Sequence, residues 1–187
     1  SSFTKHEIVR RTHKTHPRSL IMTDSFPAYT IDELPIELND VAPIEEDDVG
    51  QVARIDTSAD FKTAHNYWRG LQGEVSERAY RLTATCLQYN PANYTLWQHR
   101  RQCWAVVSTR PEVEWSLVRK VGGDNPKNYQ IWHHLRCMVE QWEDEAMNSI
   151  VFINGVLKED AKNYHAWSFR QWLAARMGSI WKRELDY

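Results

Sequence analysis

The side chains best suited to chemistry lie in three similar segments of the chain, at residues 90–97 (NPANYTLW), 125–132 (NPKNYQIW) and 160–167 (DAKNYHAW). An alanine of the first segment is replaced by Lys127 and Lys162, and a threonine by Gln130 and His165. Positions that change while their surroundings repeat are not required by the fold, so these four residues are candidates for binding. An ammonium can pair with an anionic oxygen, and an amide can donate a hydrogen bond. Taken alone, Lys127 is more simply explained as a solvated surface lysine.

The other reactive residues do not form a recognisable site. His133 and His134 are adjacent on an expected helix and point apart, so they cannot chelate one metal ion together. The three cysteines are odd in number and far apart, which excludes a CxxC metal knuckle and suits a reducing compartment. The sequence contains no glycine-rich nucleotide loop, nucleophile elbow or HExxH string. We therefore expect no metal site and no self-contained catalytic centre in this chain.

The three segments belong to an internal repeat with a period of 35 residues. Residues that recur in every unit are most simply structural. We predict that they knit turns and fill the core between helices, and they are Asn93, Asn128, Asn163, Trp97, Trp132 and Trp167, with the tyrosines at 94, 129 and 164.

Each unit has the pattern of two helices. The Asn or Asp at 90, 125 and 160 is an expected N-cap, with proline following in the first turn of two units. Apolar spacing predicts second helices at 111–121 and 146–158 and earlier helices at 61–70 and 75–88. A helical hairpin that cannot bury its apolar face alone must stack on its neighbours. The predicted fold is therefore an all-α, right-handed α-solenoid of stacked helical hairpins with 35-residue repeats.

Composition and charge set the domain boundaries and exclude several classes. The net charge of −2 argues against a general nucleic-acid binder, and no apolar window is long enough to span a membrane. Residues 1–50 hold five basic and ten acidic residues without a helical period, so we predict a disordered acidic and polar tail there. Residues 51–187 form the expected repeat domain, with clear repeats starting near Asn90, Asn125 and Asp160. No targeting signal is evident in residues 1–21, so the expected location is the cytoplasm.

The repeat segments carry a family resemblance. NPANYTLWQHRR, NPKNYQIWHHLR and DAKNYHAWSFR resemble the repeats of the α subunit shared by protein farnesyltransferase and type I protein geranylgeranyltransferase. The resemblance covers about residues 50–187 and implies a crescent of α-hairpins wrapped around a β subunit. It also implies transfer of a farnesyl or geranylgeranyl group from its diphosphate to a cysteine in a C-a-a-X motif. Members have more repeats than three, so the resemblance implies a repeat domain that is incomplete at its C-terminus.

The resemblance also implies roles for individual residues. Lys127 matches a lysine that reaches the isoprenoid diphosphate as a catalytic group, and Gln130 matches a glutamine that binds the terminal carboxylate of the acceptor. Tyr129, Tyr164 and His165 match residues that line the same opening. The zinc ion and most of both substrate pockets are expected in the β subunit, with magnesium beside the diphosphate. The chain is accordingly expected to be inactive without its β subunit.

One departure and one alternative accompany this interpretation. Leu135 stands where the first and third units have Arg100 and Arg170, which removes a guanidinium from a position that belongs to an arginine pair in the family. The alternative is a non-catalytic, TPR-like scaffold that binds only protein partners, because its 34-residue period is close to 35. The NYxxW pattern in every unit favours the prenyltransferase interpretation.

Overall fold

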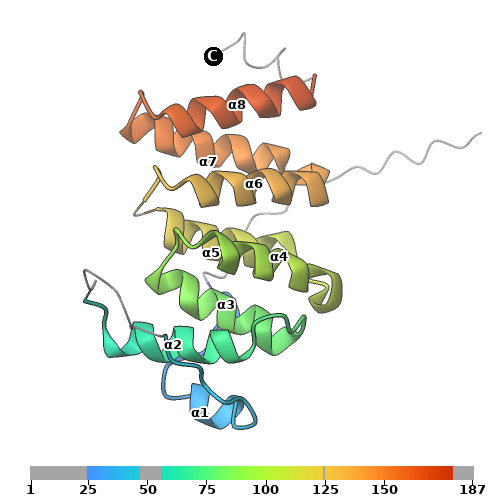
Figure 1. Cartoon of the computed structure of the whole chain (residues 1–187). Coiled ribbons are helices and arrows are strands. Elements are labelled where there is room, and N and C mark those ends of the chain that lie inside the picture. Colours follow the sequence, from blue (N-terminus) through green and yellow to red (C-terminus); the bar gives the residue numbers. More distant parts are fainter. Residues whose placement is uncertain (1–24, 47–55, 124, 179–187) are drawn as a thin grey trace, which may run out of the picture.

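The described part of the chain consists of helices stacked one after another. The computed structural model describes residues 25–46, 56–123 and 125–178, and no strand occurs among them. The helices are α1 (Leu34–Glu37), α2 (Ala59–Gly70), α3 (Glu77–Tyr89), α4 (Tyr94–Val107), α5 (Pro111–Gly122), α6 (Tyr129–Gln141), the 3₁₀ helix η1 (Glu143–Glu145), α7 (Ala146–Glu159) and α8 (Tyr164–Arg176). They follow one another along the stack from α1 to α8 (Figure 1). The predicted all-α solenoid is confirmed.

The helices form two layers, and within each layer a helix contacts the next but one along the chain. Helix α4 contacts α6, and α6 contacts α8, whereas α3 contacts α5 on the other side. The helices predicted from apolar spacing at 61–70, 75–88, 111–121 and 146–158 correspond to α2, α3, α5 and α7, with ends that differ by at most two residues. Apolar periodicity therefore located these helices correctly, since each buries one face against its neighbours.

The N-caps predicted at 90, 125 and 160 were wrong, because α4, α6 and α8 each begin about one helical turn later. Asn93, Asn128 and Asn163 are the N-caps of α4, α6 and α8, and each side-chain oxygen accepts a hydrogen bond from a backbone N–H of the first helical turn. The residues at 90, 125 and 160 instead begin tight turns, in which the N–H of the capping asparagine donates to the carbonyl three residues before it. Proline suits the second position of such a turn, where its fixed φ is already correct. We name these turns 1 (90–93), 2 (125–128) and 3 (160–163).

The repeated tryptophans tie these turns to the helices that follow. The indole N–H of Trp97 donates to the carbonyl of Pro91 at 2.8 Å, and that of Trp132 donates to Pro126 at 2.7 Å. Both rings are buried, as a structural role requires. Trp167 makes the same bond to Ala161 but is 45% exposed, since α8 is the last helix described.

The acidic segment before the repeats is ordered over residues 25–46, which corrects the prediction of a disordered tail there. Leu34 and Leu38 are fully buried in the main core, and Pro35 lies in the first turn of the short helix α1 between them. Thr85 of α3 bonds both the N–H and the carbonyl of Tyr29. Two apolar residues four apart therefore anchor a segment whose average composition is that of an unfolded chain.

Two acidic side chains of this segment pair with arginines of the repeat domain. Asp40 accepts two hydrogen bonds of 2.7 Å from Arg78, and Glu46 accepts one of 2.6 Å from Arg69. Acidic side chains on which the prediction of disorder rested thus form ion pairs with the repeat domain. The predicted tail at 1–24 and 47–50, the boundary near 50 and the expected C-terminal incompleteness at 179–187 lie outside the described residues. Among the described helices, none has the length and apolar character needed to cross a bilayer.

Candidate functional site

An exposed row of tyrosines runs along one edge of the stack. Tyr94, Tyr129 and Tyr164 are the first residues of α4, α6 and α8 and are 67%, 71% and 71% exposed. The prediction that these rings fill the core was wrong. Each tyrosine is the first residue of its helix, and the residues two and three places later, such as Leu96 and Trp97, face the core instead.

The structure brings three of the predicted site residues together. The rings of Tyr129 and His165 meet edge to face, with 4.3 Å between their centroids. Tyr164 contacts the same imidazole in a similar geometry at 5.8 Å. His165, in the first turn of α8, therefore joins the start of α6 to the start of α8.

Lys127 lies beside this aromatic cluster, in turn 2. Its side chain is 73% exposed, and its ammonium lies 3.6 Å from a carboxylate oxygen of Asp160 in turn 3. Gln130 is partly exposed in the first turn of α6, next to Tyr129. Lys162 is exposed in turn 3 and donates its backbone N–H to Asp160.

The edge formed by these residues can bind an anionic group. It offers an exposed ammonium at Lys127, an imidazole at His165 and the hydroxyl groups of two exposed tyrosines, all of which can donate hydrogen bonds. Within the described residues, no group of His, Cys, Asp and Glu side chains is arranged to hold a metal ion. The individual roles of Lys127, Gln130, Tyr129, Tyr164 and His165 stay predictions.

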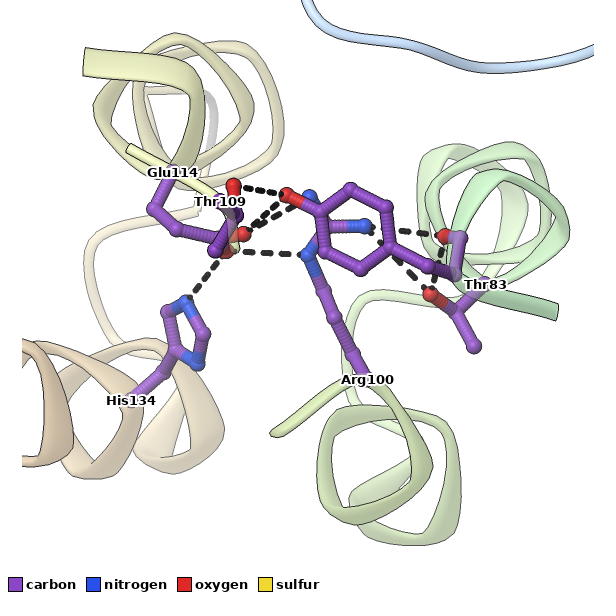
Figure 2. A network of polar contacts seen from close by, with 6 residues as sticks. Thr83, Arg100, Thr109, Glu114 and His134 are labelled. Atoms are coloured by element: carbon purple, nitrogen blue, oxygen red, sulfur yellow. Dashed lines mark hydrogen bonds and ion pairs between the residues drawn. The ribbon is translucent and has the colours of Figure 1, made fainter. Parts of the chain in front are cut away.

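A second polar constellation is buried between the first two repeat units (Figure 2). Glu114 of α5 accepts hydrogen bonds from two guanidinium nitrogens of Arg100, at 2.9 and 3.0 Å, and from the Tyr80 hydroxyl. The Nε2 atom of His134 lies 3.0 Å from the same carboxylate. Arg100 also donates to Thr83 and to the carbonyl of Tyr80. The network thus joins helices α3, α4, α5 and α6.

The charges in this network follow from burial and pairing. Burial favours the neutral form of Glu114, but the charge of Arg100 and the hydrogen bond to His134 outweigh it and hold the pKa of Glu114 well below its ordinary value. Burial lowers the pKa of His134, although the hydrogen bond to Glu114 opposes this. An ionised carboxylate, a guanidinium and a neutral imidazole therefore make up the network near neutral pH.

Sequence reasoning missed Glu114. Its signal was a carboxylate inside the apolar stripe of α5, next to the buried Trp115 and three residues before Leu117. His99 and His134 occupy the same repeat position, and both imidazoles are buried.

The departure at Leu135 has a structural explanation. Arg100 pairs with Glu114, and the residues 35 positions later are Leu135 and Ser149, both fully buried. One repeat unit later, the guanidinium and its carboxylate partner are thus both replaced by neutral side chains. Leu135 leaves no uncompensated buried charge, because the opposing position is also neutral.

Comparison with known proteins agrees with this architecture. Residues 76–105, 111–142 and 147–177 match the family described as protein prenyltransferase alpha subunit repeat. The chain is 40% identical over 76 residues to the protein farnesyltransferase/geranylgeranyltransferase type-1 subunit alpha of Solanum lycopersicum, a stretch that covers 40% of this chain and 22% of that protein.

A solved structure, Candida albicans protein geranylgeranyltransferase-I complexed with GGPP, superposes with a TM-score of 0.67 at 25% sequence identity. The superposition covers 75% of this chain and 50% of the other, so the chain spans half or less of the length of these relatives. The repeat match, the sequence relative and the solved structure all point to the same family. The chain therefore belongs to the protein prenyltransferase alpha-subunit repeat family.

Proposed function

We propose that this chain is the α subunit, or part of it, of a heterodimeric CaaX prenyltransferase. The enzyme would transfer a farnesyl or geranylgeranyl group from its diphosphate to a cysteine near the C-terminus of an acceptor protein. The observation that carries the proposal is the exposed edge on family repeats where Tyr129 meets His165 and Lys127 of the adjoining turn meets Asp160. The relatives' names support the same reaction class.

The chemistry assigns Lys127 its role. The acceptor sulfur forms a bond to the first carbon of the isoprenoid, while the bond between that carbon and the diphosphate oxygen breaks and leaves its electron pair on the oxygen. An exposed, mobile ammonium can follow that oxygen as its negative charge grows. Lys127 would therefore stabilise the transition state more than the bound substrate.

The neighbouring residues would position the acceptor peptide. The amide of Gln130 can donate a hydrogen bond to a terminal carboxylate. Tyr129, Tyr164 and His165 form a joined aromatic wall, and such rings bury much apolar surface while keeping a polar atom available. We assign these four residues to binding of the acceptor and to lining the opening between the subunits.

The proposal places the rest of the active site in the partner. A zinc ion in the β subunit would lower the pKa of the acceptor thiol, and magnesium would accompany the diphosphate. We propose that the chain is inactive alone, because most of both substrate pockets would belong to the β subunit. A cytoplasmic location accompanies the proposal.

Co-expression with a prenyltransferase β subunit tests the function. We expect a stable one-to-one complex that transfers a labelled isoprenoid to a peptide ending in C-a-a-X, whereas neither chain alone does so. Mutation of the peptide cysteine to serine is the control and should abolish transfer. A complex that forms but transfers neither farnesyl nor geranylgeranyl would contradict the proposal and favour a scaffold that binds only proteins.

A further inference from the structure

Three contacts join turns 2 and 3 and the helix starts that follow them, at the edge that carries Lys127. The ammonium of Lys127 lies 3.6 Å from Asp160, and the ring of Tyr129 meets that of His165 at 4.3 Å. The side-chain amide of Asn163 also donates to the carbonyl of Pro126 at 3.3 Å. A charged and a hydrogen-bonded contact therefore join the two turns, and an aromatic contact joins the helices that follow them.

The corresponding charged contact cannot form between turns 1 and 2. Lys127 is replaced there by Ala92, and Asp160 by Asn125, so both charges are missing together. The hydrogen bond is missing as well. The side-chain nitrogen of Asn128, which corresponds to that of Asn163, is buried without a partner among the described residues. Of the two junctions between turns in the described residues, the one that forms the candidate site therefore carries the lysine and its carboxylate as a pair.

Asp160 is well placed to hold its partner. One carboxylate oxygen accepts the backbone N–H of Lys162 at 3.1 Å, which orients the carboxylate within turn 3. The other oxygen faces Lys127. Asp160 also ends α7, where its N–H donates to the carbonyl of Val156. A carboxylate fixed by its own turn can restrict a long lysine side chain that would otherwise sample many rotamers.

The pair leaves Lys127 able to bind a second anion. An ammonium has three N–H donors, and at 3.6 Å the contact to Asp160 is longer than a direct hydrogen bond. At least two donors can therefore point to an incoming phosphate oxygen. We propose that Asp160 is a positioning residue that holds the Lys127 ammonium toward the isoprenoid diphosphate; this inference rests on the proposed prenyl transfer.

A double-mutant cycle in the complex with the β subunit tests the proposal. Asp160→Asn introduces the residue type that turn 2 has at Asn125, and Glu159→Gln removes the same charge one position earlier, from an exposed side chain. We expect Asp160→Asn to slow single-turnover transfer about two- to fivefold, the size of an exposed ion pair. The same substitution in a Lys127→Ala background should have no effect on the rate.

Affinity, salt dependence and the controls complete the test. Affinity for the isoprenoid diphosphate should stay within about twofold of wild type, and the effect of Asp160→Asn should shrink as salt is raised. An equal loss in both backgrounds, or an equal loss from Glu159→Gln, would overturn the role of Asp160. A wild-type complex that transfers no isoprenoid would instead overturn the proposed function itself, so the two failures are distinguishable.

Discussion

The guanidinium of Arg100 and the carboxylate of Glu114 form a two-bond ion pair whose side chains are both completely buried. Glu114 also accepts hydrogen bonds from Tyr80 and lies against His134, so a single carboxylate links four helices. Because both charges have been removed from water, each depends on the other for its stability.

Breaking this pair from one side should be much more harmful than replacing both partners. Arg100→Leu should lower the free energy of unfolding by about 3–5 kcal/mol, because it leaves the carboxylate buried and uncompensated. Adding Glu114→Ser reproduces the Leu135 and Ser149 combination of the next junction and should recover more than half of that loss. Urea unfolding of both variants checks the prediction, and a double variant less stable than Arg100→Leu would contradict it.

His134 should make the stability of the fold depend on pH near neutrality. Burial lowers the pKa of His134 in the folded protein, whereas the unfolded side chain titrates near its ordinary value of about 6.5. As pH falls through that value, the unfolded chain binds a proton that the folded chain does not, so the free energy of unfolding decreases. His134→Phe, the residue type of Phe169 one unit later, should reduce the decrease between about pH 7.5 and 5.5. An unchanged slope in thermal melts at several pH values would show that another group titrates.

The repeated tryptophans should differ in their contribution to stability. Trp132→Ala should destabilise the protein by about 3–5 kcal/mol, because the ring is buried and holds turn 2 through Pro126. Trp167→Ala is the matched control with the same indole bond on a half-exposed ring, and it should cost about 1 kcal/mol. Equal losses by calorimetry would mean that burial is not what distinguishes the two sites.

The segment before the repeats should contribute to folding through helix α1. Leu34→Ala should lower the free energy of unfolding by about 2–5 kcal/mol, since its side chain is fully buried in the main core. Ile36→Ala, on the same helix but 69% exposed, should change it by at most about 0.5 kcal/mol. Denaturant unfolding of the two variants should show this difference, and a Leu34→Ala variant as stable as wild type would refute the packing role of the segment.

Lys127 should affect the chemical step and not the fold. Lys127→Ala, in the complex with the β subunit, should slow single-turnover transfer about ten- to a thousandfold, because one charge-assisted donor to a transition state is lost. Its side chain is largely exposed, so the melting temperature should stay close to that of wild type. Lys162→Ala, at the same repeat position one unit later, is the control and should have little effect. Equal transfer rates for Lys127→Ala and wild type would remove this residue from the mechanism.

The amino-acid sequence alone was sufficient to predict the repeat, the solenoid and most of the helices. The reason is that apolar periodicity and the NYxxW pattern are local properties, readable wherever one helix must bury one face. Variation between the units also identified Lys127, Gln130 and His165 as residues that the fold does not require. These inferences needed no knowledge of how distant segments pack.

Only the tertiary structure decided which residues meet. Asn90 and Asn93 are both good capping residues, and the choice between them depended on a turn that proline favours. The burial of Leu34 and the pairing of Glu114 with Arg100 depended on contacts between segments that lie apart in the chain. Such contacts follow from how helices pack against one another, and a packing partner that is remote in sequence leaves no periodic signal in the sequence itself.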